Sequence, residues 1–273
     1  MSWLFDPPTA TTGPDSRAMA YGDGVFTTAA VRSGAILFRE RHIERLQHGC
    51  ERLAIEPPGQ GRIDQLLSRS LSHGTAAAML KIMAFRAGSK RGYRPSEQDA
   101  AILAARCYPL DGVDEWPDLA PLRLGLAALR WAVQPALAGL KHLNRLEQVL
   151  AAAEIRSTDD VLCCDTSGQV VSASSANVFA VIDGELLTPP LDTAGVTGVT
   201  RAAVSAICRR DAIALRVEPL THDDLVRCSE MFLTSSRFGI RPVGNHAGRA
   251  LPIGPVTRDL HRRLLRETPL CAG

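Results

Sequence analysis

The sequence lacks the features of a secreted, membrane-spanning or disulfide-stabilised protein. Its first residues have neither the basic segment nor the apolar run of a signal peptide, and no stretch approaches ~18 uninterrupted apolar residues. The seven cysteines are odd in number and show no CxxC spacing, which argues against a disulfide framework and against a zinc site. We therefore expect reduced, mostly buried thiols and no bound metal in a cytoplasmic protein.

The sequence also lacks an excess of charge of one sign. Its formal net charge is +2 over 273 residues, which gives no electrostatic reason to bind nucleic acid or an anionic membrane. A small anionic ligand remains compatible with this balance, because a few local arginines suffice to hold it. The composition, 45% hydrophobic and 22% charged, is that of a globular protein long enough for one large domain or two modest ones.

Several common catalytic signatures are absent as well. No HExxH, GxSxG, Walker A or GxGxxG motif occurs in a convincing context, and Gly22-Asp23-Gly24 fits the spacing of none of them. The chemistry must therefore come from other residues.

A segment rich in proline and glycine, residues 109–121, is the best candidate for an interdomain linker. We predict an α+β protein with a small N-terminal domain, residues 1–108, and a larger domain, residues 122–273. In the first domain, periodicity predicts helices from Arg39 and over Arg62–Ser72, with strands over Gly24–Val31, Ala78–Arg86 and Ala100–Tyr108.

After the linker, strands and helices alternate without a steady βαβ rhythm, and there is no internal repeat. An Asp-Gly turn at 183–184 predicts a β-hairpin. We expect helices over Leu143–Ser157, from Val199 onwards, and over Val256–Arg266. The strands expected are Leu122–Val133, Val161–Cys164, Val170–Ser172, Val178–Ile182, Glu185–Thr188, Leu215–Val217 and Met231–Ser235.

Lys141 lies between a predicted strand and a predicted helix, in AGLKHLNRLEQVLAAAE. A lysine at such a junction can point into a cleft while the helix anchors its backbone, and its amine can form a Schiff base with a carbonyl. A solvated lysine near a helix start is the simpler interpretation, because isolated lysines are usually exposed. Lys141 alone therefore leaves both interpretations open.

Three segments could together bind a phosphate group. Residues 195–201, GVTGVTR, place two glycines and two threonines just before a helix, where backbone amides bind anions. Thr234 and Ser235 end an apolar strand, and Arg45 offers a fixed positive charge. Taken singly, each is more simply a helix cap, a turn or a surface arginine. The small residues of SASSAN, 172–177, leave room for a flat ligand, or form a polar loop.

Six segments, taken in order, resemble the fold-type IV pyridoxal-phosphate (PLP) enzymes, which include branched-chain aminotransferases, D-amino acid aminotransferases and aminodeoxychorismate lyases. The KHLNRLEQVLA run, with RGY and GVTG, is similar to the lyase branch. The resemblance extends from about residue 17 to 243 and is carried by residues 21–31, 42–46, 86–93, 139–152, 175–179 and 195–201. It implies a smaller N-terminal domain, a larger domain with a mixed, barrel-like sheet, and a homodimer whose active site lies between the domains, near the partner subunit.

The resemblance also implies roles for particular residues. Lys141 matches the lysine that binds PLP covalently, and no metal is implied. The residues that match cofactor contacts are Arg45, Ser172, Asn177, Val199, Thr200, Thr234 and Ser235, and those on the substrate side are Arg91, Tyr93 and Thr27.

Ser172 departs from the family pattern. Family members generally carry a glutamate there that protonates the pyridine nitrogen, whereas this chain has no acidic residue from 169 to 182. A neutral hydroxyl leaves PLP a weaker electron sink, which disfavours transamination more than an elimination driven by aromatisation. We therefore expect a lyase that converts aminodeoxychorismate to 4-aminobenzoate and pyruvate in folate biosynthesis, with Lys141 as general base. The alternatives are an aminotransferase and a weakly catalytic PLP-binding homologue.

Overall fold

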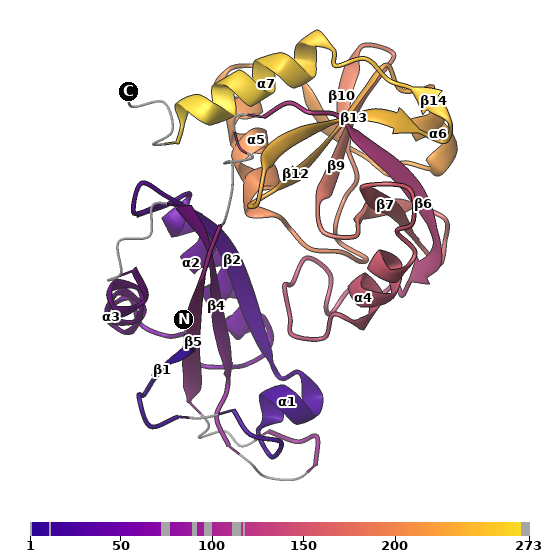
Figure 1. Cartoon of the computed structure of the whole chain (residues 1–273). Coiled ribbons are helices and arrows are strands. Elements are labelled where there is room, and N and C mark those ends of the chain that lie inside the picture. The colour runs from indigo at the N-terminus through magenta and orange to yellow at the C-terminus, as the bar shows by residue number, and fades with distance from the viewer. Residues whose placement is uncertain are drawn as a thin grey trace. The chain divides into compact units, whose positions relative to one another are not determined.

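The computed structural model describes residues 2–10, 12–71, 77–88, 92–95, 100–110, 116 and 118–268. The chain forms two compact units (Figure 1): Met1–Val113 with Lys141–Asn144, and Asp114–Leu140 with Arg145–Gly273. The first change of unit falls within the predicted linker, of which residues 111–115 and 117 lie outside the described residues. The segment Lys141–Asn144 joins the N-terminal unit although it is distant from it in sequence.

The N-terminal unit is a five-stranded antiparallel sheet with the strand order β1-β5-β4-β2-β3. Its strands are β1 (Leu4–Asp6), β2 (Gly24–Arg32), β3 (Ala35–Ile36), β4 (Ala77–Arg86) and β5 (Ala101–Pro109), and its helices are α1 (Arg17–Tyr21), α2 (Arg39–Arg52) and α3 (Gln60–Leu71). The apolar stripes of α2 and α3 pack on the sheet and form its core, with Ile43, Leu46 and Cys50 from α2 and Ile63, Leu66 and Leu67 from α3.

The C-terminal unit is built on a mixed sheet of nine strands, ordered β11-β10-β9-β12-β13-β6-β7-β8, with β14 paired to β13. Strand pairs β10/β11, β13/β6 and β6/β7 are parallel and the others antiparallel. The strands are β6 (Leu122–Trp131), β7 (Asp160–Asp165), β8 (Val170–Ala173), β9 (Asn177–Ile182), β10 (Glu185–Thr188), β11 (Leu215–Val217), β12 (Glu230–Ser235), β13 (Gly239–His246) and β14 (Arg249–Ala250).

Four helices accompany this sheet: α4 (Leu146–Ala153), α5 (Val199–Arg210), α6 (His222–Arg227) and α7 (Pro255–Arg266). In Figure 1 the strands curl around a shared centre, and α5 and α7 lie together beside β12 and β13. The main core of the unit joins apolar residues of β7, β8, β9, β12 and β13. The predicted mixed sheet in the larger C-terminal part is confirmed.

Both predicted boundaries of one helix are wrong. The helix expected over Leu143–Ser157 spans only Leu146–Ala153, and residues 142 and 143 before it pair with β2. Lys141 is therefore anchored by a strand and not by a helix. The short helices α1 and α6 and the strands β3, β13 and β14 were absent from the sequence prediction.

The six cysteines that the structure describes are buried and form no disulfide with one another, as expected, whereas Cys271 lies outside the described residues. No helix in the described part of the chain is long and apolar enough to cross a membrane.

Candidate active site

Lys141 lies on an extended segment that pairs with the beginning of β2. The carbonyl of Lys141 accepts the Phe26 N–H at 2.8 Å, and the carbonyl of Gly24 accepts the Leu143 N–H at 2.9 Å. Asn144 Nδ2 completes the segment by donating to the carbonyl of Gly22 at 3.4 Å, just before β2. These bonds fix the chain from the carbonyl of Lys141 to Asn144.

Two lysines lie against the Phe26 ring. The Nζ of Lys141 lies 4.6 Å from the ring centroid, and the Nζ of Lys81 lies 4.7 Å from it. Lys81 is half-buried on β4, and burial lowers its pKa. Among the described residues no carboxylate pairs with Lys81, so this cation can receive an anionic ligand.

Arg45 is held by Thr27, the residue of β2 that follows Phe26. The Nη2 of Arg45 donates to Thr27 Oγ1 at 2.5 Å, and the same hydroxyl lies 2.6 Å from His42 Nδ1. Burial lowers the pKa of Arg45 to about 10. Burial, followed by the positive charges of Arg45 and Lys141, holds the pKa of His42 well below its usual value, so His42 is neutral at pH 7.

Thr27 is fully buried, and its hydroxyl is occupied by these two neighbours. The structure therefore gives Thr27 a part in orienting Arg45. Its predicted contact with substrate stays a prediction.

In the C-terminal unit, Asn177 fixes the loop before α5. Its Nδ2 donates to the carbonyl of Val196 at 3.0 Å, and its Oδ1 accepts the N–H of Gly198 at 3.1 Å. The same loop pairs with Gly139, whose N–H donates to Gly195 O at 3.1 Å. Both glycines have positive φ, 78° for Gly139 and 85° for Gly195, a conformation that favours glycine. The loop that opens α5 is thus joined to the chain two residues before Lys141.

Two predicted phosphate contacts have buried hydroxyls with unfilled hydrogen-bonding capacity. Thr200 and Thr234 are 1% and 2% exposed, and neither Oγ1 has a hydrogen-bond partner among the described residues. Thr234 is the strand partner of Asn177, and Val199 and Thr200 form the first turn of α5, where amides lack partners within the helix. An anion with several oxygen acceptors satisfies such a donor set.

Ser235, next to Thr234, ends β12 at a turn. Its Oγ accepts the N–H of Arg237 at 3.3 Å. Its predicted cofactor contact stays a prediction.

Ser172 is buried on β8, and its Oγ donates to the carbonyl of Ala173 at 2.8 Å. The neighbouring strand β7 begins with a buried carboxylate, Asp160. Asp160 Oδ1 accepts from Ser174 N and Oγ at 3.1 and 2.5 Å, which fixes the SASSAN segment. Sequence reasoning missed Asp160, although an acidic residue that begins an apolar strand is a usable signal.

The two remaining predicted substrate contacts have different standing. Arg91 lies outside the described residues. Tyr93 is 86% exposed, and its ring packs against that of Tyr21 with centroids 5.4 Å apart. The structure therefore leaves Tyr93 accessible to a ligand.

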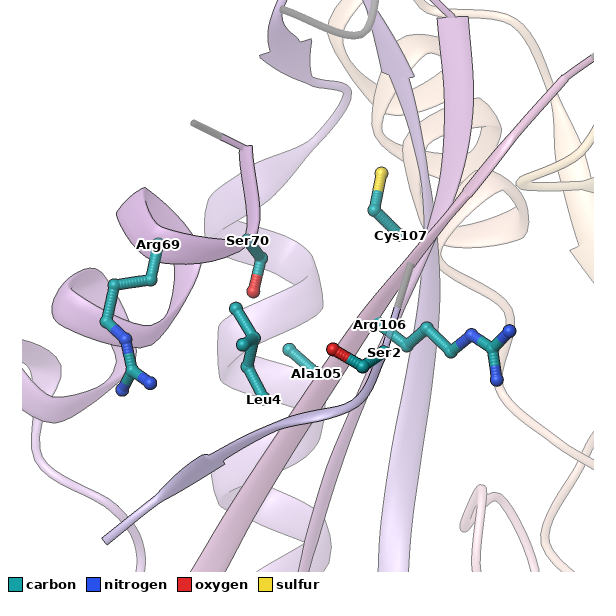
Figure 2. A pocket seen from close by; sticks show the side chains of 7 residues that line it. All are labelled: Ser2, Leu4, Arg69, Ser70, Ala105, Arg106 and Cys107. Atoms are coloured by element: carbon teal, nitrogen blue, oxygen red, sulfur yellow. The ribbon is translucent and has the colours of Figure 1, made fainter. Parts of the chain in front are cut away.

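A separate cavity of about 130 Å³ lies between β1, α3 and β5 of the N-terminal unit (Figure 2). In Figure 2 the guanidinium groups of Arg69 and Arg106 point away from one another, so they do not converge on one ligand. None of the predicted site residues lines it; its walls are Ser2, Leu4, Arg69, Ser70, Ala105, Arg106 and Cys107.

The model for the class IV amino-transferases matches residues 24–245 of the chain. The chain belongs to the class IV aminotransferase family. Aminodeoxychorismate lyase of Vibrio harveyi is 30% identical to this family member over 97% of this chain and 99% of its own. The crystal structure of 4-amino-4-deoxychorismate lyase from Pseudomonas aeruginosa superposes with a TM-score of 0.89 at 35% identity, covering 98% of this chain and 100% of that one.

The crystal structure of a branched-chain aminotransferase from Thermoproteus uzoniensis with norvaline has a TM-score of 0.85 at 22% identity, covering 97% of this chain and 94% of that one. At this identity the likeness concerns the fold alone. The predicted fold class, the two-domain α+β fold of the fold-type IV PLP enzymes, is confirmed.

Proposed function

We propose that this class IV family member is a PLP-dependent 4-amino-4-deoxychorismate lyase that releases 4-aminobenzoate and pyruvate. The observation that carries the proposal is the full-length similarity to two lyases, at 30% and 35% identity, against 27% for a putative branched-chain-amino-acid aminotransferase of Methanocaldococcus jannaschii and 22% for the aminotransferase structure. The TM-scores of 0.89 and 0.85 differ little. Sequence, and not fold, therefore favours the lyase branch.

Ser172 supports the same choice. Its buried hydroxyl donates to Ala173 O and brings no negative charge to the position where the family usually has glutamate. Ser172 would therefore not hold the pyridine nitrogen of bound PLP protonated, and electron withdrawal by the cofactor would be weaker. An elimination that makes an aromatic ring tolerates this weakness better than amino transfer does.

The residues present fit the cofactor. Lys141 would bind it covalently, and Arg45, the first turn of α5 and the unpartnered hydroxyls of Thr200 and Thr234 would hold its phosphate. When bound, PLP supplies an electron-withdrawing group on the substrate amine. Asn177 would keep the phosphate loop in place through its two bonds.

Lys141 is also the candidate base. Its amine would take the proton from the ring carbon that bears the substrate amine. The carbon–oxygen bond on the neighbouring carbon would then break and the ring would become aromatic. The departing enolate would take a proton from Lys141 or from a threonine near the ring, so that pyruvate leaves as its enol. The substrate has two carboxylates, and Lys81, which shares the Phe26 ring with Lys141, is a cation suited to one of them.

Product analysis with aminodeoxychorismate tests the function. We expect equal amounts of 4-aminobenzoate and pyruvate. Rapid conversion of the bound cofactor to its pyridoxamine form by an amino acid, without 4-aminobenzoate, would instead support an aminotransferase. No pyruvate at high enzyme concentration would support a PLP-binding protein with little catalysis.

Substitution of the lysine tests its role. Lys141→Ala should abolish turnover and the absorbance of covalently held cofactor, because no amine remains to bind it. Cofactor that stays attached to this variant after borohydride treatment and dialysis would contradict the assignment.

Helix α4 supports the proposal that two copies associate. Leu146, Val149 and Leu150 are 75%, 60% and 54% exposed, while Glu147 and Glu154 accept backbone N–H groups of β6 and of the residue after it. The apolar side chains of α4 are thus exposed and its acidic side chains contact the sheet, which is the opposite of the usual orientation of an amphipathic helix. Because burying each large apolar side chain contributes about 1.5–3 kcal/mol, this face favours a second copy of the chain as its partner.

Sedimentation tests the dimer. Leu146→Ser with Leu150→Ser should shift the protein towards monomer, whereas Val217→Ser, at an exposed apolar position on β11, should not. An unchanged dimer would exclude α4 from the interface.

A further inference from the structure

Hydrogen bonds to main-chain atoms hold the turn at Gly92 and Tyr93 in place. Arg17 Nη1 donates to Gly92 O and Nη2 donates to Tyr93 O, each at 2.9 Å. The N–H of Gly92 donates to Tyr21 Oη at 3.1 Å. One arginine thus binds two consecutive carbonyls, and a tyrosine accepts an N–H of the same turn.

Arg17 is itself immobilised. It is 4% exposed, its Nε donates to Asp23 Oδ2 at 2.7 Å, and its guanidinium carbon lies 5.1 Å from the Tyr21 ring centroid. A planar guanidinium with donors fixed on three acceptors has little rotational freedom. The position of the turn therefore depends on the position of Asp23.

Asp23 also accepts a hydrogen bond from a second arginine. Arg86 Nε donates to the same Oδ2 at 3.0 Å, and its other nitrogens donate to Ala54 O and Leu53 O at the end of α2. Arg86 ends β4, the strand that precedes Gly92 and Tyr93 in the chain. One carboxylate therefore ties the end of that strand to the turn.

The stretch that follows Asp23 holds the Lys141 segment. Gly24 O accepts the Leu143 N–H and Phe26 N–H donates to Lys141 O, while Asp23 O accepts the Arg86 N–H at 3.1 Å. Within the N-terminal unit, the lysine segment and the turn are thus bound to the same few residues.

The network holds backbone and leaves the Tyr93 side chain accessible. Arg17 and Tyr21 bind carbonyls and an N–H of the turn, yet Tyr93 remains 86% exposed, with its ring resting against that of Tyr21. A fixed backbone with an exposed side chain is the arrangement expected of a residue that contacts a ligand. The phenol of Tyr93 can donate a hydrogen bond to a carboxylate.

We propose that Arg17 is a positioning residue that presents the Tyr93 phenol to a carboxylate of the substrate. The inference rests on the proposed function for the identity of that substrate, a dicarboxylate. Arg17 acts through the turn and does not touch the substrate, so its loss should weaken substrate binding more than it slows turnover.

A double-mutant cycle tests the proposal. Tyr93→Phe should raise KM for aminodeoxychorismate roughly 10-fold, because it removes the donor and keeps the ring. Arg17→Ala should raise KM in the same way with a smaller change in kcat, and should leave cofactor absorbance unchanged. The double variant should be no worse than Arg17→Ala alone. Additive effects of the two substitutions, or an unchanged KM in Arg17→Ala, would overturn the proposal.

Arg62→Ala is the matched control. Arg62 also joins separate elements, donating to Asp6 Oδ2 at 2.6 Å and to Ala101 O at 3.0 Å, but it does not contact the turn. It should lower stability without changing KM. Arg17→Lys should not restore binding, because an ammonium cannot bind both carbonyls with the same fork.

If Arg17→Ala fails to fold, Tyr21→Phe provides the test, since it removes only the hydroxyl that accepts the Gly92 N–H. We expect a smaller KM increase in the same direction; an unchanged KM would count against the proposal. If the wild-type protein forms no pyruvate, the proposed function fails. The same KM comparison is then made with the amino acid that converts the cofactor, and its result still decides the role of Arg17.

Discussion

Thr234 lies directly opposite Asn177 on the neighbouring strands β12 and β9. Asn177 uses its amide to hold Val196 and Gly198 in the loop that opens α5. Thr234 has a buried hydroxyl with no partner among the described residues. One member of the pair therefore shapes the proposed anion site, and the other can offer it a donor.

Removing the unpartnered hydroxyls should affect stability and cofactor binding in opposite directions. Thr200→Val or Thr234→Val should raise the cofactor Kd roughly 10-fold or more, because a hydrogen bond to a charged group contributes about 1.5–3 kcal/mol. Without cofactor, the same variants should unfold at equal or higher temperature, since an unsatisfied buried hydroxyl is removed. Fluorescence titration and thermal unfolding of both forms measure the two effects.

Thr257→Val is the control for this pair. Thr257 on α7 is also buried, but its hydroxyl donates to Glu230 Oε2 at 2.8 Å. The substitution should destabilise the cofactor-free protein without changing the Kd. Loss of stability in the Thr200 and Thr234 variants would contradict the expected role of their hydroxyls.

Lys81→Met should weaken substrate binding selectively. The variant keeps the aliphatic stem beside Phe26 and removes a half-buried cation that no described carboxylate neutralises. We expect KM for aminodeoxychorismate to rise about 10-fold, which corresponds to one charge-assisted hydrogen bond, and Lys81→Arg to retain most affinity. Steady-state kinetics with unchanged KM would remove Lys81 from the substrate site.

Stability should fall as pH decreases below about 6.5, partly because of His42. Its pKa is lowered in the folded protein by burial and by nearby Arg45 and Lys141, so the unfolded chain binds more protons in this range. Burial also lowers the pKa of His246, which adds a contribution of the same sign. His42→Asn should therefore reduce the slope of unfolding free energy between about pH 6.5 and 5 without abolishing it, as denaturant titration measures. An identical slope would contradict this linkage.

Restoring a carboxylate at position 172 should shift the reaction. Ser172→Glu would place a negative charge where the family usually has one, and a protonated pyridine nitrogen makes PLP a stronger electron sink. We expect amino acids to convert the cofactor to its pyridoxamine form roughly 10-fold faster or more, as stopped-flow absorbance measures. Ser172→Ala, which adds no charge, should not have this effect. Equal rates of cofactor conversion in both variants would show that residue 172 does not decide between elimination and amino transfer.

Periodic sequence signals predicted the long elements well. Helix α2 and the β9–β10 hairpin follow from apolar spacing and an Asp-Gly turn. The helices α1 and α6 are too short for a period to develop, and each depends on a cap, Ser16 for α1 and the Thr221–Asp224 box for α6. Strand β13, with its glycine, proline and asparagine residues, has little strand propensity and depends on pairing with its neighbours.

The candidate site was predictable where a motif carried it. Lys141 and Thr200 lie in segments that resemble the family, and Thr234 was proposed because it ends an apolar strand. Lys81 and the Arg17–Asp23 network could not be found in this way, because their significance depends on strand register and on contacts between residues far apart in the chain.

The chain leaves the C-terminal unit for Lys141–Asn144 alone and then returns to it. No single cut in the polypeptide therefore separates the two units. A fragment that ends in the linker would lack the segment that pairs with the start of β2, and a fragment that begins after the linker would carry the reactive amine without that partner. The protein is thus not a modular fusion of two interchangeable pieces, and its lysine has its pairing partner only when both units are present.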